Sequence, residues 1–277
     1  SVLGEASPRA LDALASLGFG FLEIGGVTPR PQPGNARPRM FRIPEAEAII
    51  NRFGFNSIGV DQFVSNLKAA RYRGIIGVNL GKNKDTPLAR AADDYVFSLE
   101  KIYPFAHFAT INVSSPNTPN LRDLQAAGEL APLLSAVHQQ RERLAQRHGR
   151  RVALALKIAP DMDAASVEAV ARIAIEQKMD AVIATNTTVS RRGVEGLRHA
   201  DEQGGLSGRP LREPSTAIVR QLARVLDGTL PVIGVGGIMC AADAQEKLDA
   251  GATLVQLYCG LVYRGPNLVS EIVAGLK

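Results

Sequence analysis

The chain passes from an apolar strand into a crowded polar loop at His107-Phe108-Ala109-Thr110-Ile111-Asn112-Val113-Ser114-Ser115-Pro116-Asn117-Thr118-Pro119. Residues 107–113 have the alternating pattern of a strand, which must end before Pro116 because proline has no N–H to donate to a sheet. The hydroxyls and carboxamides that follow donate and accept neutral hydrogen bonds, and two prolines stiffen the loop that carries them. Taken alone, the loop fits a polar turn and a binding loop equally well.

Apolar strands and helical patterns alternate along almost the whole chain, which predicts parallel βαβ units. The predicted strands are Phe19–Ile24, Ile75–Asn79, His107–Val113, Val152–Ile158, Ala181–Ala184, Pro231–Val235 and Thr253–Leu257. The predicted helices are Ala10–Ser16, Asp61–Ala70, Leu88–Ile102, Glu129–Gln146, Ala164–Gln177, Ser215–Leu226, Ala241–Ala250 and Leu268–Leu276. Asp61, Asp163 and Ser215 are predicted to cap helix N-termini. Seven or eight such units favour a barrel over an open sheet.

A length of 277 residues with 45% hydrophobic content suits a single domain. We predict one (β/α)8 TIM barrel over residues 1–277, of the α/β class. Its first strand would fall at Ser1–Glu5, a poor strand sequence, so this strand is predicted to be atypical or missing. Two insertions, Thr28–Ser57 and Val189–Gly208, follow strand ends and are expected to cover the C-terminal face as loops or small hairpins.

Composition excludes several classes of protein. The net charge of +5 is small. Its main cluster of positive residues, Arg141–Arg151, is expected on a solvated helix face. Because the chain also has no Trp, the sequence does not indicate nucleic-acid binding. Cys240 and Cys259 give neither a disulfide framework nor metal spacing, so we expect no metal site and a reducing, cytoplasmic setting. No apolar run is long enough to span a bilayer.

Polar residues recur just after the predicted strands, where a barrel gathers them into one pocket. They are Asn51, Asn56, Asn79, Asn112, Ser115, Asn117, Lys157, Thr185, Asn186 and Thr187. A single asparagine is commonly a turn or cap residue, but six together suit the amide and imide edges of a pyrimidine-like ring.

Lys157 and a set of glycines add a possible cofactor. Lys157 lies inside an apolar strand, so its ammonium must face an anion or an electron-rich group, or form a structural ion pair. Gly234–Ile238 and Tyr258–Gly260 follow the last two strands, the usual phosphate site of a barrel. The residues alone therefore predict a barrel for FMN or another phosphate-bearing ligand.

Several segments resemble the dihydroorotate dehydrogenase family, specifically its quinone-linked class 2 enzymes. They are Ile111–Pro119, Asn51–Asn56, Thr28–Asn35, Ala184–Thr188 and Gly204–Pro210. The resemblance implies an FMN-containing (β/α)8 barrel that oxidises dihydroorotate to orotate in pyrimidine biosynthesis, with a quinone as electron acceptor.

The resemblance also implies roles for residues. Ser115 would be the catalytic base, and a serine there marks class 2, because class 1 enzymes carry cysteine. The implied substrate-binding residues are Asn51, Arg52, Phe53, Gly54, Phe55, Asn112, Asn117, Asn186 and Thr187. The implied FMN-binding residues are Asn79, Asn112, Lys157, Thr185, Gly208, Gly237, Tyr258 and Cys259.

The sequence departs from the family pattern at three points. Ala6 stands where the family has a first-strand lysine, and Gly26 stands where it has Ser or Thr. The N-terminal helical extension of the family is expected to be missing. The family implies peripheral contact with the cytoplasmic side of a membrane; without the extension, soluble cytoplasmic behaviour is expected. Two alternatives stay open: a truncated or degenerate, catalytically weak barrel that at most binds ligand, and a different FMN barrel, such as a dihydropyrimidine or dihydrouridine oxidoreductase.

Overall fold

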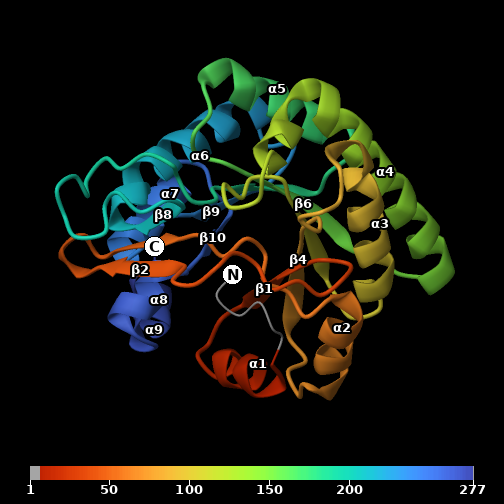
Figure 1. Cartoon of the computed structure of the whole chain (residues 1–277), viewed down its shortest axis with the longest axis horizontal. Helices are drawn as coiled ribbons and strands as arrows, with labels where there is room; N and C mark the ends of the chain where they lie inside the picture. The colour runs from red at the N-terminus through yellow and green to blue at the C-terminus, as the bar shows by residue number, and fades with distance from the viewer. Residues whose placement is uncertain (1–6, 277) are drawn as a thin grey trace.

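Seven parallel strands form one curled sheet at the centre of the computed structural model, which describes residues 7–276 (Figure 1). In spatial order they are β1 (Phe21–Val27), β4 (Ile75–Leu80), β5 (Phe108–Asn112), β6 (Ala153–Ile158), β7 (Ala181–Ala184), β9 (Val232–Val235) and β10 (Leu254–Gln256). The predicted α/β barrel is confirmed. The described sheet ends at β1 and β10, and an eighth strand that closes the barrel would lie between them. The segment predicted for it, Ser1–Glu5, falls outside the described residues.

Helices follow the strands and pack around the outside of the sheet, as crossover connections require (Figure 1). Their bounds are α1 (Pro8–Ala15), α2 (Val60–Ala69), α3 (Ala91–Ile102), α4 (Ala127–His148), α5 (Ala164–Glu176), α6 (Arg212–Leu226), α7 (Ala241–Asp249), α8 (Cys259–Arg264) and α9 (Asn267–Gly275). In α6 the buried Ile218, Val219, Leu222 and Leu226 recur at helical spacing and form the face that packs on β9.

Side chains inside the curled sheet change from apolar to polar along the strands. Phe21 and Phe108, at the starts of β1 and β5, meet edge to face with ring centroids 5.8 Å apart. Together with the buried Ile183 they belong to an apolar cluster that fills this end of the interior. Because strand side chains alternate, the next inward positions are Glu23 on β1 and Lys157 on β6. Polar chemistry is therefore confined to the C-terminal half of the barrel.

A second, antiparallel sheet covers the C-terminal face. It pairs β2 (Met40–Ile43) with β3 (Ala48–Asn51) and β3 with β8 (Gly205–Gly208). The two predicted insertions thus join into one sheet. Gly208 permits this contact: its φ is +103°, and a Cβ there would lie 2.2 Å from the Glu47 carbonyl oxygen.

Short 3₁₀ helices complete the connections: η1 (Pro44–Ala46), η2 (Leu88–Arg90), η3 (Leu121–Gln125) and η4 (Arg209–Leu211). Of the predicted caps, Asp163 is confirmed, since its side chain accepts a hydrogen bond from the Ser166 N–H. The caps at Asp61 and Ser215 are wrong. Helix α2 starts one residue before Asp61, and Ser215 lies inside α6, where its hydroxyl donates to the Val235 carbonyl.

The arginine cluster Arg141–Arg151, at the C-terminal end of α4 and just beyond it, is only partly solvated, so that prediction is wrong for Arg141. The Arg141 side chain is fully buried and pairs with Asp180 at 2.9 Å, whereas Arg147 and Arg151 are more than half exposed. The reason is helical spacing: Arg141 falls in line with Val137 and the other buried positions of α4, so it faces the core.

Candidate active site

A cavity of about 510 Å³ opens at the C-terminal ends of the barrel strands. This volume lies in the range of small-molecule sites. One side of the cavity is polar and includes Ser115, Lys157 and Asn186, from the ends of β5, β6 and β7. The other side is apolar and includes Leu261 of α8 and Ile272 of α9. One cavity therefore offers hydrogen-bonding and hydrophobic surfaces side by side.

Carboxamides at the polar side hold one another in a chain. The Asn112 Nδ2 donates to Asn79 Oδ1 at 2.9 Å, and the Asn186 Nδ2 donates to Asn112 Oδ1 at 3.2 Å. On the roof, Asn117 Nδ2 donates to Asn51 Oδ1 at 3.1 Å. These bonds fix the orientation of each amide, so the donors and acceptors left over face the cavity in a set arrangement.

A buried ion pair lies beneath these amides. The Lys157 Nζ is 3.4 Å from Glu23 Oε1, and both side chains are largely buried. Glu23 also accepts hydrogen bonds from Asn79 and from Gln256. Burial alone would raise the pKa of Glu23, but the Lys157 charge and the two amide donors outweigh it and lower that pKa. The ion pair left open in the sequence is present, and Lys157 lines the cavity as well.

Ser115 lies in the loop after β5, half-buried at the cavity wall. Its Oγ accepts a 3.3 Å hydrogen bond from the Asn117 N–H, so the loop folds around the hydroxyl. Two nearby hydroxyls, Thr118 Oγ1 and Thr187 Oγ1, are buried and have no hydrogen-bond partner among the described residues. A buried hydroxyl without a partner is costly, so these groups suit a proton relay or a ligand.

On the opposite rim of the cavity, the backbone near Gly237 approaches the cavity closely. Gly237 has a φ of +73°, and a Cβ there would lie 2.5 Å from the Arg212 backbone, so only glycine fits. Cys259 lies close by, with its Sγ 3.0 Å from the Ser207 Oγ. Burial raises the pKa of the Cys259 thiol to about 11, and burial also raises the pKa of Tyr258. Both groups are neutral near pH 7, so this rim offers polar contacts without a nucleophile.

The structure brings nearly all the predicted site residues to this cavity. Those that line it are Asn51, Phe53, Gly54, Phe55, Asn56, Asn112, Ser115, Asn117, Lys157, Thr185, Asn186, Thr187, Gly208, Gly237, Tyr258 and Cys259. Asn79 lies behind the wall, bonded to Asn112 and Glu23. Arg52 lies outside the cavity, because its guanidinium pairs with Glu202 at 2.7 Å and stacks over the Phe41 ring.

Sequence reasoning missed three groups. Glu23 and Gln256 interrupt apolar strands as Lys157 does, and the same signal identifies them. Thr118 lies three residues after Ser115, but only its burial marks it out. Over residues 7–276, no cluster of three or more potential ligands could hold a metal ion, and no helix is long and apolar enough to cross a membrane.

Comparison with known proteins identifies the family. The sequence profile of the family described as Dihydroorotate dehydrogenase matches residues 5–277. The chain is 60% identical over 266 residues to the dihydroorotate dehydrogenase (quinone) of Paraburkholderia phymatum, covering 96% of this chain and 77% of that protein. It is 61% identical over 267 residues to the enzyme of the same name from Burkholderia multivorans, with the same coverage.

Solved structures agree. The DHODH of Eimeria tenella in complex with ferulenol matches with a TM-score of 0.89 at 36% identity, over 95% of this chain and 75% of that one. Its ligand-free form matches with a TM-score of 0.88 at 38% identity, over 95% and 78%. The chain belongs to the dihydroorotate dehydrogenase family, in its quinone-dependent class.

Proposed function

We propose that this chain oxidises dihydroorotate to orotate with FMN as its flavin and passes the electrons to a quinone. The observation that carries the proposal is the convergence of Ser115, five cavity-lining asparagines and Lys157 on one cavity. The names of the relatives that match at about 60% identity support it.

The residues present fit a flavin mononucleotide. Lys157 offers a cation at the cavity wall, and Asn112 and Thr185 line the same cavity. Gly236 and Gly237 both have positive φ and line the cavity, so backbone N–H groups there can face a phosphate. The chemistry that a bound flavin supplies is the acceptance of two electrons as a hydride. In this proposal, Lys157, Asn112, Thr185 and Gly237 hold it.

The asparagines suit the substrate. Dihydroorotate has an imide edge with both donors and acceptors, and a carboxamide can pair with either. Asn51 and Asn117 are bonded to each other on the roof, and Asn112 and Asn186 are bonded to each other below. In this proposal, the two amide pairs bind the ring from two sides and orient its C5 and C6 atoms.

Ser115 accepts the C5 proton in this proposal. A serine hydroxyl is a weak base at its ordinary pKa, so the proton must be passed on. Thr118, whose buried hydroxyl has no partner among the described residues, is the group we assign to that relay. The sheet of β2, β3 and β8 contributes Asn51, Ser207 and Gly208 to the cavity wall, and in this proposal it limits the entry of water to the reacting atoms.

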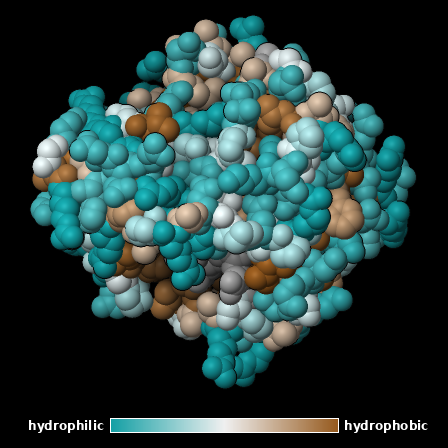
Figure 2. Space-filling model, viewed as in Figure 1, coloured by the Kyte–Doolittle hydropathy of each residue, from teal (hydrophilic) through white to brown (hydrophobic). Residues whose placement is uncertain are grey.

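The apolar side of the cavity suits the quinone. Leu257, Leu261, Val269 and Ile272 line it, and Val262 and Val273 at its border are 41% and 65% exposed. Figure 2 shows hydrophobic surface in the lower left of the view, where α8 lies in Figure 1. We propose that this surface lies against the cytoplasmic side of a membrane, from which a lipid-soluble quinone reaches the cavity.

The degenerate-barrel alternative rests on two departures. Ala6 lies outside the described residues. At Gly26, a Cβ would lie 2.4 Å from the Phe55 ring, so Phe55 occupies the space that a Ser or Thr side chain would need. At Gly26, therefore, the Phe55 ring fills the part of the cavity wall that a Ser or Thr side chain would fill, and the cavity is still present.

The test is anaerobic addition of dihydroorotate to the purified, FMN-loaded chain. We expect the visible absorption of the bound flavin to be bleached and to return when a soluble quinone is added. A chain that retains no flavin, or a bound flavin that dihydroorotate leaves oxidised, would contradict the proposal. Dihydrouridine and dihydrouracil serve as controls and should not bleach it.

A further inference from the structure

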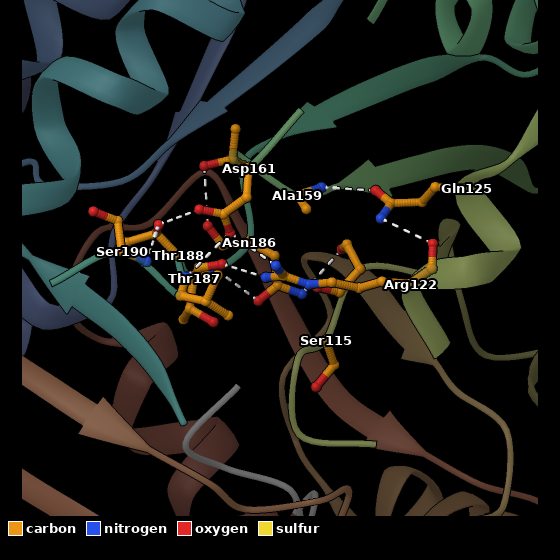
Figure 3. Close-up of polar contacts among 12 residues, drawn as sticks. Ser115, Arg122, Gln125, Ala159, Asp161, Asn186, Thr187, Thr188 and Ser190 are labelled. Atoms are coloured by element: carbon orange, nitrogen blue, oxygen red, sulfur yellow. Dashed lines mark hydrogen bonds and ion pairs between the residues drawn. The ribbon is translucent and has the colours of Figure 1, made fainter. Parts of the chain in front are cut away.

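Arg122 lies where three strand-end loops meet. Its Nε donates to the Ser114 carbonyl at 3.0 Å, and its Nη2 donates to the Thr187 carbonyl at 2.7 Å. Figure 3 shows the side chain reaching from η3 across to the Asn186–Thr188 segment, while the Ser115 side chain points away from the guanidinium. One planar group thus joins the backbone next to Ser115 to the backbone next to Asn186.

Asp161, in the loop after β6, holds the guanidinium in place. Its Oδ2 pairs with Arg122 Nη1 at 2.8 Å and accepts a 3.1 Å hydrogen bond from the Val189 N–H. Its Oδ1 accepts from the Thr188 hydroxyl. The side chains of Arg122 and Asp161 are 21% and 23% exposed, so the pair is partly shielded from water.

Gln125 holds the backbone from which Arg122 extends. Its Oε1 accepts from the Ala159 N–H at 2.9 Å, which ties η3 to the end of β6. Arg122, Asp161 and Gln125 together form a clasp, the name used below, across the ends of β5, β6 and β7. None of the three lines the cavity, so their effect on chemistry there must pass through the loops.

We infer that Arg122 is a positioning residue that sets the separation of Ser115 from Asn186 and Thr187. This inference rests on the proposed roles of Ser115, Asn186 and Thr187. A guanidinium presents its donors in one rigid plane, so it fixes the direction of both carbonyls, whereas the three donors of a lysine ammonium rotate about its flexible stem. The clasp therefore keeps Ser115, the proposed proton acceptor, at a fixed distance from Asn186, the proposed ring-binding amide.

The first test is Arg122→Lys, which keeps the positive charge but removes the planar set of guanidinium donors. The matched control is Arg147→Lys. Arg147 is an exposed arginine paired with Glu100 on the outer surface. We expect flavin reduction by dihydroorotate to slow about 100-fold, as for a misplaced reacting group. Orotate affinity should fall about 10-fold, while FMN affinity stays within about threefold of the control.

Amide hydrogen exchange distinguishes a local effect of Arg122 on the two loops from a general loss of stability of the fold. The measurement does not depend on catalytic activity. Exchange at residues 113–118 and 186–190 should rise in Arg122→Lys and in Asp161→Asn and stay unchanged in the other strands. Unchanged exchange in both loops would overturn the clasp. A rise across the whole sheet, or loops that loosen without slower flavin reduction, would overturn the positioning role.

A double-mutant cycle with Ser115→Ala shows whether Arg122 acts through the serine. If it does, Arg122→Lys costs less than threefold in flavin reduction once Ser115 is gone. A full 100-fold further loss would contradict the inference. If Ser115→Ala alone has no effect, the proposed base is wrong, but the exchange and orotate measurements still decide whether the clasp exists.

Discussion

The two sides of the cavity are held in opposite ways. On one side, which we call the braced wall, Ser114–Asn117 and Asn186–Thr188 are tied together by Arg122 and Asp161. On the other side, which we call the seam, β1 and β10 each have only one neighbour in the described sheet. Leu254 of β10 is 47% exposed there.

The difference matches the chemistry proposed for each side. Removing a proton and a hydride from adjacent carbons needs groups fixed to within a fraction of an ångström, which the braced wall provides. A quinone needs an apolar approach without set geometry, which the cavity-lining side chains of α8 and α9 provide. Side chains still cross the seam: Gln256 on β10 donates to Glu23 on β1 at 2.6 Å. Glu23 then reaches Lys157 on β6.

The largest effect is expected on the braced wall, from Ser115→Ala. Loss of the proton acceptor should slow flavin reduction by dihydroorotate about 1,000-fold, the usual scale of general base catalysis. FMN content and orotate affinity should change little. Stopped-flow absorbance measures the rate, with Ser135→Ala on α4 as the control; a rate within threefold of the unsubstituted chain would refute the assignment.

The next effect is expected where the two sides meet, from Glu23→Gln. The change leaves the Lys157 ammonium largely buried without its counter-charge, which should lower the free energy of unfolding by about 3 kcal/mol. Urea unfolding at pH 7 measures it. Glu100→Gln, in an exposed pair with Arg147, should change stability by less than about 0.5 kcal/mol. Equal losses of unfolding free energy in the two variants would show that Glu23 does not stabilise the fold more than an exposed glutamate does.

The same carboxylate predicts a pH dependence. Because the pKa of Glu23 is lowered in the folded chain, the unfolded chain binds this proton first as pH falls. The stability that Glu23 provides is therefore complete above its ordinary pKa of about 4.5 and is lost as pH falls through the lower, folded value. Below pH 4.5 the unsubstituted chain should lose stability more steeply than Glu23→Gln. Parallel acid unfolding curves would contradict this sign.

A smaller effect is expected on the seam, from Gln256→Leu. Removing a hydrogen bond to a charged group should cost about 1.5 kcal/mol and should raise amide exchange in β1 and β10 before β5 or β6. Gln139→Leu, on the exposed face of α4, is the control. Gln256→Leu and Glu23→Gln share one hydrogen bond, so their costs should be less than additive. Full additivity would mean that the seam is held by other contacts.

The smallest effect is expected at the apolar border, from Val273→Ser. Loss of about one buried methylene equivalent should raise the KM for a lipid-soluble quinone about fourfold, while flavin reduction by dihydroorotate is unchanged. Val189→Ser, at a valine 53% exposed after β7, is the control. If both variants behave alike, the quinone approaches from another side.

The sequence predicted what depends on short-range pattern and missed what depends on distant contacts. Apolar runs identified the seven strands, and nearly all the polar residues predicted after strand ends line the cavity. The sheet of β2, β3 and β8 joins residues about 150 positions apart, and no local pattern encodes that pairing. No pattern in the sequence marks Arg122 or Asp161, because their importance lies in the distant carbonyls to which Arg122 donates and in the donors that Asp161 accepts from. The burial of Arg141 differs from these cases, because its helical spacing from Val137 could have predicted that it faces the core.

The central claim is that this cavity oxidises dihydroorotate and passes the electrons to a quinone. Anaerobic incubation of the FMN-loaded chain with dihydroorotate and a soluble quinone, followed by quantification of orotate, tests it most directly. We predict that one orotate forms for each quinone reduced, over many turnovers per chain, and that Ser115→Ala forms almost none. No orotate beyond the amount of bound flavin, or equal orotate from Ser115→Ala, would contradict the account.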